Sequence, residues 1–140
     1  MAVFDFDKTL IDGDVAYLFM NTAIKASKLR RMAVGMLVPL LLPFLLVRPG
    51  RLIIVSVMMW IATFPLRGRT ARSVFSAFAA GMLTPVNARF YDEGATALAA
   101  HRRLGHRLLI ISGSPQELVR QIAHPVLGRD IRINGSQIDP

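Results

Sequence analysis

Short apolar runs near both ends of the chain have the character of buried β-strands. Residues 2–6 (AVFDF) and 107–112 (RLLIIS) are rich in branched or aromatic side chains, and a polar loop follows each of them. Residues 130–133 (DIRI) form a third candidate strand, with a turn expected at Asn134–Gly135. The pattern therefore predicts one strand at the start of the chain and two near its end.

The segments between the first two strands have helical spacing. Residues 15–29, 67–83 and 92–106 each repeat apolar side chains at intervals of three and four. In the second of these segments, the apolar face is formed by Val74, Phe78 and Met82.

The motif SGSPQE marks the start of a further helix. Ser114 is the expected N-cap, Pro115 suits the first helical position, and Glu117 completes a capping box. This helix is expected to end near Ala123, because Pro125 follows.

Two long uncharged runs, residues 32–47 and 52–66, occupy the middle of the chain on either side of the turn signal RPGR. As α-helices of 16 and 15 residues, they would be about 24 and 22 Å long. The hydrocarbon core of a bilayer is about 30 Å thick, so neither run is a comfortable span. We interpret the runs as a thin membrane hairpin or a layer in the membrane interface. A soluble helical bundle is the alternative.

The order of these elements is typical of an α/β fold with parallel strands and right-handed crossovers. We expect residues 1–14 and 90–140 to form the α/β core and residues 15–89 to form a helical insert. Active sites in such sheets lie at the carboxyl ends of the strands. The acidic loop after the first strand and the SGSP motif after the second should therefore meet at one edge.

Charge is unevenly distributed along the sequence. The net charge is +8, yet residues 15–91 contain ten Lys or Arg and no Asp or Glu. Such a block favours an anionic partner such as lipid headgroups or phosphorylated ligands, and a solvated cationic face is the alternative. Nucleic acid is disfavoured because the cations alternate with Leu, Ile and Met and not with stacking aromatics. The sequence contains no cysteine, which excludes disulfides and thiolate metal sites.

The acidic loop begins with DFDKT, in which two carboxylates are two residues apart. Strand alternation sends Asp5 and Asp7 to the same side and Phe6 into the core. One carboxylate can attack phosphorus while the other protonates the leaving group, and a hard cation such as Mg²⁺ would offset their repulsion from phosphate. A calcium loop is excluded because its sixth and twelfth positions hold Leu10 and Ala16. A solvated turn is the remaining alternative.

The SGSP motif supplies a second polar cluster after a strand. Ser112, the Gly113 amide and the start of the following helix would together form a phosphate cradle. The alternative is that Ser112 and Ser114 are only helix caps.

These motifs together resemble the haloacid dehalogenase superfamily of phosphatases. The resemblance implies a Rossmann-like parallel sheet, here truncated after three strands, with an inserted helical cap of the C1 type. It implies that Asp5 is the aspartyl nucleophile and Asp7 the general acid/base, and that Mg²⁺ binds the Asp5 side chain and the Asp7 backbone carbonyl. Thr9, Ser112 and Gly113 would bind the phosphate.

The loop and the insert add a more specific similarity. Asp14 stands where phosphoserine phosphatases carry a Glu that binds the substrate amine, although a surface acid is equally consistent with the sequence. Residues 41–64, 111–119 and 133–139 resemble the membrane-bound phosphatidylglycerophosphatases of this superfamily. That similarity implies conversion of phosphatidylglycerophosphate to phosphatidylglycerol on the cytoplasmic side of a bacterial inner membrane.

The partners implied are an anionic phospholipid surface and a phosphorylated substrate, without an obligate protein partner. Two alternatives stay open: a soluble, cytoplasmic phosphoserine phosphatase-like hydrolase, or a truncated, inactive remnant that binds membranes.

Two further motifs of the superfamily, a Lys that neutralises the phosphate and a late acidic pair, find no match after Ser112. Arg120 is a poorly placed stand-in for the lysine, and we expect the sequence to be a fragment or a truncated form. His101, His106 and His124 have no metal-ligand spacing and are interpreted as structural or solvent-facing.

Overall fold

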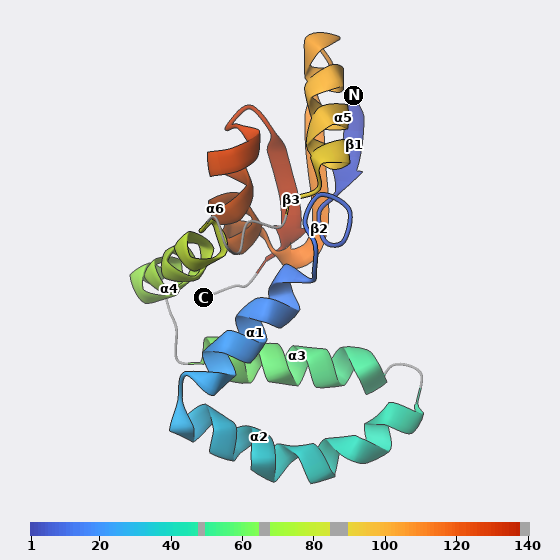
Figure 1. Cartoon of the computed structure of the whole chain (residues 1–140). Helices are drawn as coiled ribbons and strands as arrows, with labels where there is room; N and C mark the ends of the chain where they lie inside the picture. The colour runs from blue at the N-terminus through green and yellow to red at the C-terminus, as the bar shows by residue number, and fades with distance from the viewer. Residues whose placement is uncertain (48–49, 65–67, 85–89, 138–140) are drawn as a thin grey trace. The chain divides into compact units, whose positions relative to one another are not determined.

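The computed structural model describes residues 1–47, 50–64, 68–84 and 90–137 (Figure 1). The chain divides into two compact units, one made of Met1–Val15 with Gly68–Pro140 and the other of Ala16–Arg67. Strands and crossover helices alternate in the first unit, which confirms the predicted α/β class.

Three parallel strands form the sheet of the first unit, in the order β1 (Ala2–Asp5), β2 (Leu108–Pro115) and β3 (Arg132–Ser136). Phe4 lies beside Ile110, and Ile110 beside Ile133, so these side chains share one face. Val3 and Ile111 lie on the opposite face and are exposed. The apolar core of the unit therefore lies on one side of the sheet.

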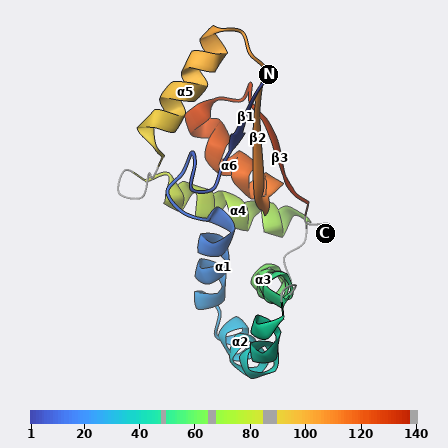
Figure 2. The same cartoon turned by 90° about the vertical axis from the view of Figure 1, so that its right-hand side faces the viewer.

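The strand topology determines on which face of the sheet the helices α5 (Asp92–Arg103) and α6 (Gln116–Leu127) lie (Figure 2). The strand order advances in one direction, so right-handed crossovers bring both helices to the same face. The ring of His101 on α5 meets Phe4 edge-on, with centroids 5.8 Å apart. The fully buried residues of α6 are Leu118, Val119, Ile122 and Ala123.

The helix α4 (Gly68–Met82) belongs to the first unit because it packs against α6. Its buried residues are Phe75 and Ala79, and the predicted stripe of Val74, Phe78 and Met82 is half-buried beside them. Contact with α6 thus removes α4 from the second unit, whereas the sequence analysis assigned the whole of residues 15–89 to the insert.

The second unit contains α1 (Val15–Lys25), α2 (Lys28–Leu41), the 3₁₀ helix η1 (Leu42–Leu46) and α3 (Gly50–Thr63). The single helix expected over residues 15–29 is therefore two helices. They separate because Ser27 adopts an extended conformation and its hydroxyl accepts a hydrogen bond from the Arg30 N–H, which makes it the N-cap of α2. The RPGR turn lies partly outside the described residues.

Two expectations near the end of the chain are also wrong. The helix α6 continues through Pro125 to Leu127 and ends at Gly128, whose φ of 104° is in the region that favours glycine. Proline costs this last turn one backbone hydrogen bond but does not end it. Asn134 and Gly135 lie within β3 and not in a turn. Gly135 fits there because a Cβ atom would come within 2.7 Å of the Ser114 carbonyl oxygen.

A salt bridge joins the end of α5 to the segment between α6 and β3. Arg102 donates to both carboxylate oxygens of Asp130, at 2.8 and 2.9 Å, and also to the Leu127 carbonyl oxygen. The hydrogen bonds from Arg102 hold the pKa of Asp130 below its usual range. The bridge therefore ties two crossover connections together at neutral pH.

We expect Asp130→Asn to lower the free energy of unfolding at pH 7 by at most about 1 kcal/mol, because the pair is exposed and screened. A carboxylate with a depressed pKa stabilises the fold above its unfolded pKa of about 4, and this contribution is lost as the pH falls through the folded value. Urea unfolding of both proteins between pH 7 and pH 2.5 should show the difference shrinking toward zero. A difference that stays constant over this range would contradict the assignment.

Candidate active site

The loop that follows β1 folds tightly around the backbone of Phe6. The Phe6 N–H donates to the Ile111 carbonyl oxygen of β2 at 3.2 Å, and the Phe6 carbonyl oxygen accepts from Leu10 at 3.0 Å and Ile11 at 3.2 Å. The side chains of these three loop residues are fully buried. Lys8, at the tip, has a φ of 61°. Apolar anchors thus fix a short polar loop at the carboxyl end of β1.

Asp5 is the last residue of β1 and lies beside Ile111 of β2 in the sheet register. Its side chain is exposed, and one carboxylate oxygen accepts a hydrogen bond of 3.1 Å from the Thr9 hydroxyl. The carboxylate is therefore both oriented by the loop and accessible from solvent.

Asp7 makes the largest set of hydrogen bonds at this edge of the sheet. Its Oδ1 accepts from the Val15 N–H at 2.8 Å, and its Oδ2 accepts from the Ser112 hydroxyl at 2.6 Å. The Ser114 hydroxyl lies 3.2 Å from Oδ1 and 3.1 Å from Oδ2. Hydrogen bonds to an ionised acceptor are short and strong, so these contacts hold the carboxylate in one orientation.

Ser114 is the site residue whose position the sequence analysis assigned wrongly. It was expected to cap the next helix, but Pro115 occupies the N-cap position of α6 and makes no side-chain cap hydrogen bond. Because β2 continues to Pro115, strand alternation sends Ser112 and Ser114 to the same side, where both are buried. The spacing of two residues between these serines was the signal in the sequence for their shared role.

The other residues expected at the site are distributed around this cluster. Gly113 separates the two serines, and its carbonyl oxygen accepts a hydrogen bond of 3.0 Å from the Ser136 hydroxyl of β3. Asp14 lies at the end of the acidic loop, directly before α1, with an exposed side chain. The structure therefore joins Asp5 to Thr9 and Asp7 to Ser112 by hydrogen bonds.

Tyr91 connects the acidic loop to the start of α5. Its hydroxyl donates to Asp12 at 3.2 Å, and its N–H donates to the Leu10 carbonyl oxygen at 3.0 Å. Partial removal from water, the hydrogen bond to Asp12 and the negative charges of Asp12 and Glu93 all raise the pKa of Tyr91. The phenol thus stays protonated at neutral pH and serves as a donor to the loop.

Oxygen ligands suited to Mg²⁺ are present, but they are few. The Asp5 carboxylate and the Asp7 backbone carbonyl are hard donors two residues apart in sequence, of the type that Mg²⁺ prefers. Within the described ranges, no group of three or more His, Asp or Glu side chains could enclose a metal ion. The donor set fits a cation that keeps several waters and takes further oxygens from a phosphate.

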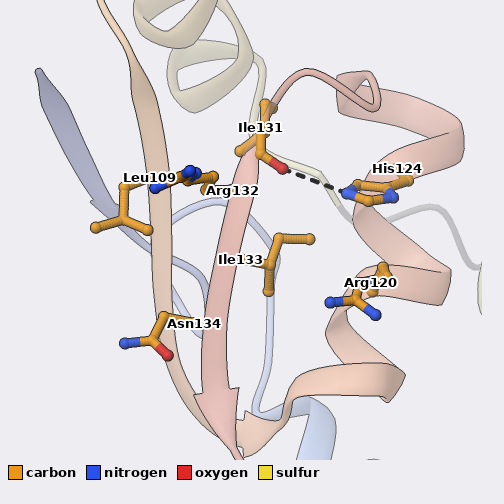
Figure 3. Close-up of a pocket in the computed structure, with 7 residues that line it drawn as sticks. All are labelled: Leu109, Arg120, His124, Ile131, Arg132, Ile133 and Asn134. Atoms are coloured by element: carbon orange, nitrogen blue, oxygen red, sulfur yellow. Dashed lines mark hydrogen bonds between the residues drawn. The ribbon is translucent and has the colours of Figure 1, made fainter.

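A cationic pocket of about 530 Å³ lies between α6 and β3, on the far side of β2 from β1 (Figure 3). Arg120 and His124 project into it from α6, and the backbone carbonyl of Ile131 lies 3.4 Å from His124 Nε2. Arg120 forms a 3.0 Å salt bridge with Glu117 of its own helix. The salt bridge fixes the Arg120 side chain along α6, beside this pocket. Thr9, Ser112 and Gly113, the predicted phosphate ligands, do not line the pocket.

Two histidines meet at the end of α5. Nδ1 of His101 lies 2.9 Å from Nδ1 of His106, so one ring donates and the other accepts. Both were expected to be structural or solvent-facing, and this contact between them was not predicted.

The chain belongs to a known class of enzymes. The family model for haloacid dehalogenase-like hydrolases matches residues 2–138, which is nearly the whole sequence. Searches of curated proteins and of solved structures return no match to the chain. The protein is therefore a haloacid dehalogenase-like hydrolase, which confirms the superfamily that the two motifs indicated.

Close packing of β3 on the site leads to a stability prediction. We expect Gly135→Ala to lower the free energy of unfolding by about 1–3 kcal/mol, because a Cβ would lie 2.7–2.9 Å from backbone atoms of Ser114 and Gln116. Gly113→Ala is the matched control, since a Cβ there meets no atom within 4 Å. Urea unfolding of both variants should separate them, and equal losses would contradict the packing argument.

Proposed function

We propose that this hydrolase cleaves phosphomonoesters through an aspartyl-phosphate intermediate on Asp5. The observation that carries the proposal is the pairing of β1 with β2, which brings Asp5 and Ser112 to neighbouring strand ends. The Phe6 N–H donates to the Ile111 carbonyl oxygen at 3.2 Å. Asp5 directly precedes Phe6 on the first strand, and Ser112 directly follows Ile111 on the second. A phosphate bound there would lie within reach of both.

In the proposed reaction, a carboxylate oxygen of Asp5 attacks phosphorus, and the bond from phosphorus to the leaving oxygen breaks. Asp7, protonated at that stage, gives its proton to the leaving alkoxide. Asp7 then takes a proton from water as that water attacks phosphorus, which releases inorganic phosphate and restores Asp5. The hydrogen bonds to Asp7 fix its carboxyl group beside the strand ends. The Ser112 hydroxyl would have to turn away from Oδ2 before that oxygen could carry the proton for the leaving group.

Ser112 would change its hydrogen-bond acceptor when phosphate binds. Its single hydroxyl proton now goes to Asp7 at 2.6 Å, while its oxygen accepts from the Ser114 N–H at 2.9 Å. A phosphate oxygen competes for that proton, and Asp7 would keep the Val15 N–H and the Ser114 hydroxyl as donors. Asp7 can therefore stay in place while Ser112 binds the substrate.

We further propose that Mg²⁺ binds at the Asp5 carboxylate and the Asp7 carbonyl oxygen. When bound, the ion would offset the negative charge of the phosphate and of the attacking carboxylate. The general use of Mg²⁺ among hydrolases of this family and the oxygen character of the two ligands support this assignment.

As the substrate, we propose phosphatidylglycerophosphate, with phosphatidylglycerol as the product. The support comes from the sequence similarity of the insert and flanking motifs to membrane-bound lipid phosphatases. The apolar segment Lys28–Leu46 has a mean hydropathy of 1.7 and is unburied, which suits an enzyme that meets a lipid. Asp14 is a candidate contact for the polar part of the substrate.

The nucleophile is tested by Asp5→Asn, with Asp12→Asn as a matched control in the same loop. We expect Asp5→Asn to lower phosphate release from phosphatidylglycerophosphate in detergent micelles by at least about 10³-fold, the scale of losing a covalent nucleophile. Asp12→Asn should keep most of the activity. Mass spectrometry of acid-quenched protein should detect a phosphoryl group on Asp5 in the wild type only, and equal activity of Asp5→Asn would contradict the assignment.

Ser112→Ala tests the phosphate contact separately. Loss of one donor to the developing charge should lower the rate by about 10²-fold without preventing phosphorylation of Asp5. A single-turnover measurement with Mg²⁺ in excess would give this rate. An unchanged rate would contradict the proposed contact between the Ser112 hydroxyl and phosphate.

Parallel assays distinguish the other two hypotheses. Preference for phosphoserine over the lipid would favour a soluble substrate, and absence of phosphorylation with either substrate would favour a binding remnant. Asp14→Asn should weaken use of phosphoserine if this residue contacts the substrate amine.

A further inference from the structure

The second unit exposes an unusual amount of apolar surface. Most of the large hydrophobic side chains that are exposed in the described chain lie between Leu29 and Phe64. Neither α2 nor η1 contains a buried residue. A soluble helix normally buries one apolar stripe, so these segments have the surface of helices that lack their natural surroundings.

The helices α2–η1 and α3 form a hairpin that packs along one seam (Figure 1). On α2, the half-buried residues Arg30, Ala33 and Leu37 recur at helical intervals. On α3, the half-buried Ile54 and Val57 and the buried Ile61 do so. The surfaces away from the seam are also apolar. Exposed residues on those surfaces include Met32, Met36, Leu40, Leu52 and Val55. Neither helix therefore has a polar face along its length, as a helix lying flat in the membrane interface would need.

Charge occurs only at the two ends of this hairpin. Four cations, Lys25, Lys28, Arg30 and Arg31, lie where α1 ends and α2 begins. At the other end, the sequence places Arg48 and Arg51 between η1 and the apolar part of α3. Acidic residues are absent from residues 15–91 of the sequence. The four cations define the base of the hairpin, and Leu46, Val47 and Gly50, at the end of η1 and the start of α3, define its tip.

The base also carries the features of a membrane–water boundary. Trp60 and Phe64 stack there, with ring centroids 5.0 Å apart, and both are more than half exposed. They line a groove of about 600 Å³ together with Leu29 and Ala33. Aromatic rings beside Lys and Arg are typical of the headgroup level of a bilayer.

Arg30 holds this base together from inside the unit. Its Nε and one terminal nitrogen donate to the Phe64 carbonyl oxygen at 3.3 and 3.0 Å, and the other terminal nitrogen donates to the Ala23 carbonyl oxygen at 3.1 Å. The ends of α1 and α3 are thereby fixed to the start of α2. The other three cations of the base are exposed and available to an external anion.

The limb α2–η1 is close to the thickness of a bilayer in its summed rise, and the limb α3 is shorter. The 14 residues of α2 rise about 21 Å and the five of η1 about 10 Å, close to the hydrocarbon thickness of about 30 Å. The 14 residues of α3 rise about 21 Å, and the uncharged run continues in the sequence to residue 66. The difference between this length and the hydrocarbon thickness would be made up by Arg side chains that extend toward the headgroups and by local thinning of the bilayer.

We propose that the α2–η1–α3 hairpin crosses an anionic phospholipid bilayer, with its base at the near headgroups and its tip at the far headgroups. Both limbs then place their apolar surface in hydrocarbon, and the cations of the base meet lipid phosphates. The hairpin enters and returns, so the chain before α1 and the chain after α3 stay on the same side. The inference would explain the lipid substrate of the proposed function, but its tests use no phosphatase activity.

Membrane binding is tested with the full chain and sealed vesicles. Synthesis in the presence of vesicles that contain phosphatidylglycerol should give protein that floats with the lipid and resists carbonate extraction. A triple variant, Lys25→Gln, Lys28→Gln and Arg31→Gln, should bind these vesicles about 10²-fold more weakly, at roughly fivefold per cation. Arg30 is left intact because it joins the helix ends.

The matched control removes three exposed cations from the first unit through Arg103→Gln, Arg107→Gln and Arg129→Gln. It should bind as the wild type does, because the cations of the base are intact. Recovery of the wild-type chain in the soluble fraction would overturn the proposal, as would equal losses in the two triple variants.

The absence of cysteine from the chain allows a direct test of the crossing. Val47→Cys marks the tip and Ala26→Cys the base, and both positions are exposed. A membrane-impermeant maleimide added outside should label the base only, and the same reagent enclosed in the vesicles should label the tip only. Labelling of the tip from outside would show that the hairpin lies on the surface. Failure to label the tip from either side would show that the tip is buried in the membrane. Either result overturns the crossing.

Trp60 provides an independent measure of depth because it is the only tryptophan in the sequence. Its emission should shift to the blue on binding, and lipids brominated near the headgroup should quench it more than lipids brominated near the chain ends. Stronger quenching by the deep bromines would contradict a base at the headgroup level.

Discussion

The hydrogen bond of 2.6 Å from Ser112 to Asp7 is the contact on which the arrangement of the site depends. It joins residues 105 positions apart in sequence, so it can form only when β1 and β2 are parallel, adjacent and in the observed register. A shift of one residue would turn Ser112 to the opposite face of the sheet and bring Ile111 toward the carboxylate. Formation of the core and assembly of the site are therefore one event.

The third strand takes part in the same constraint. Gly135 of β3 lies against the Ser114 and Gln116 backbone, and Ser136 donates to the Gly113 carbonyl oxygen. The segment from Ser112 to Ser114 is thus held from both sides, by the acidic loop and by β3. Since the backbone of this segment is fixed, exchange of the Ser112 proton from Asp7 to a phosphate would need only a rotation of the hydroxyl group.

Much of this could be predicted from sequence because it depends on local patterns. The alternating pattern at the start of the chain predicted that Asp5 and Asp7 point to the same side. The apolar run before Ser112 predicted the strand β2. The role of Ser114 was not predicted, although its spacing of two residues from Ser112 was a signal for it. A serine before Pro115 fits a helix cap equally well, and the distant carboxylate decides between the two roles. The packing of α4 against α6 could not be predicted for a similar reason, because the two helices are more than 30 residues apart in the sequence.

The two units place their positive charges in different ways. In the first unit, Arg102 pairs with Asp130 and Arg120 with Glu117, so these cations are balanced within the fold. In the second unit, Arg30 binds only backbone carbonyl oxygens, and its neighbours Lys28 and Arg31 are exposed in a stretch of sequence without acids. A soluble surface usually mixes both signs, because like charges repel. A unit that concentrates cations at the ends of an apolar hairpin is instead adapted to a surface that supplies the negative charge itself.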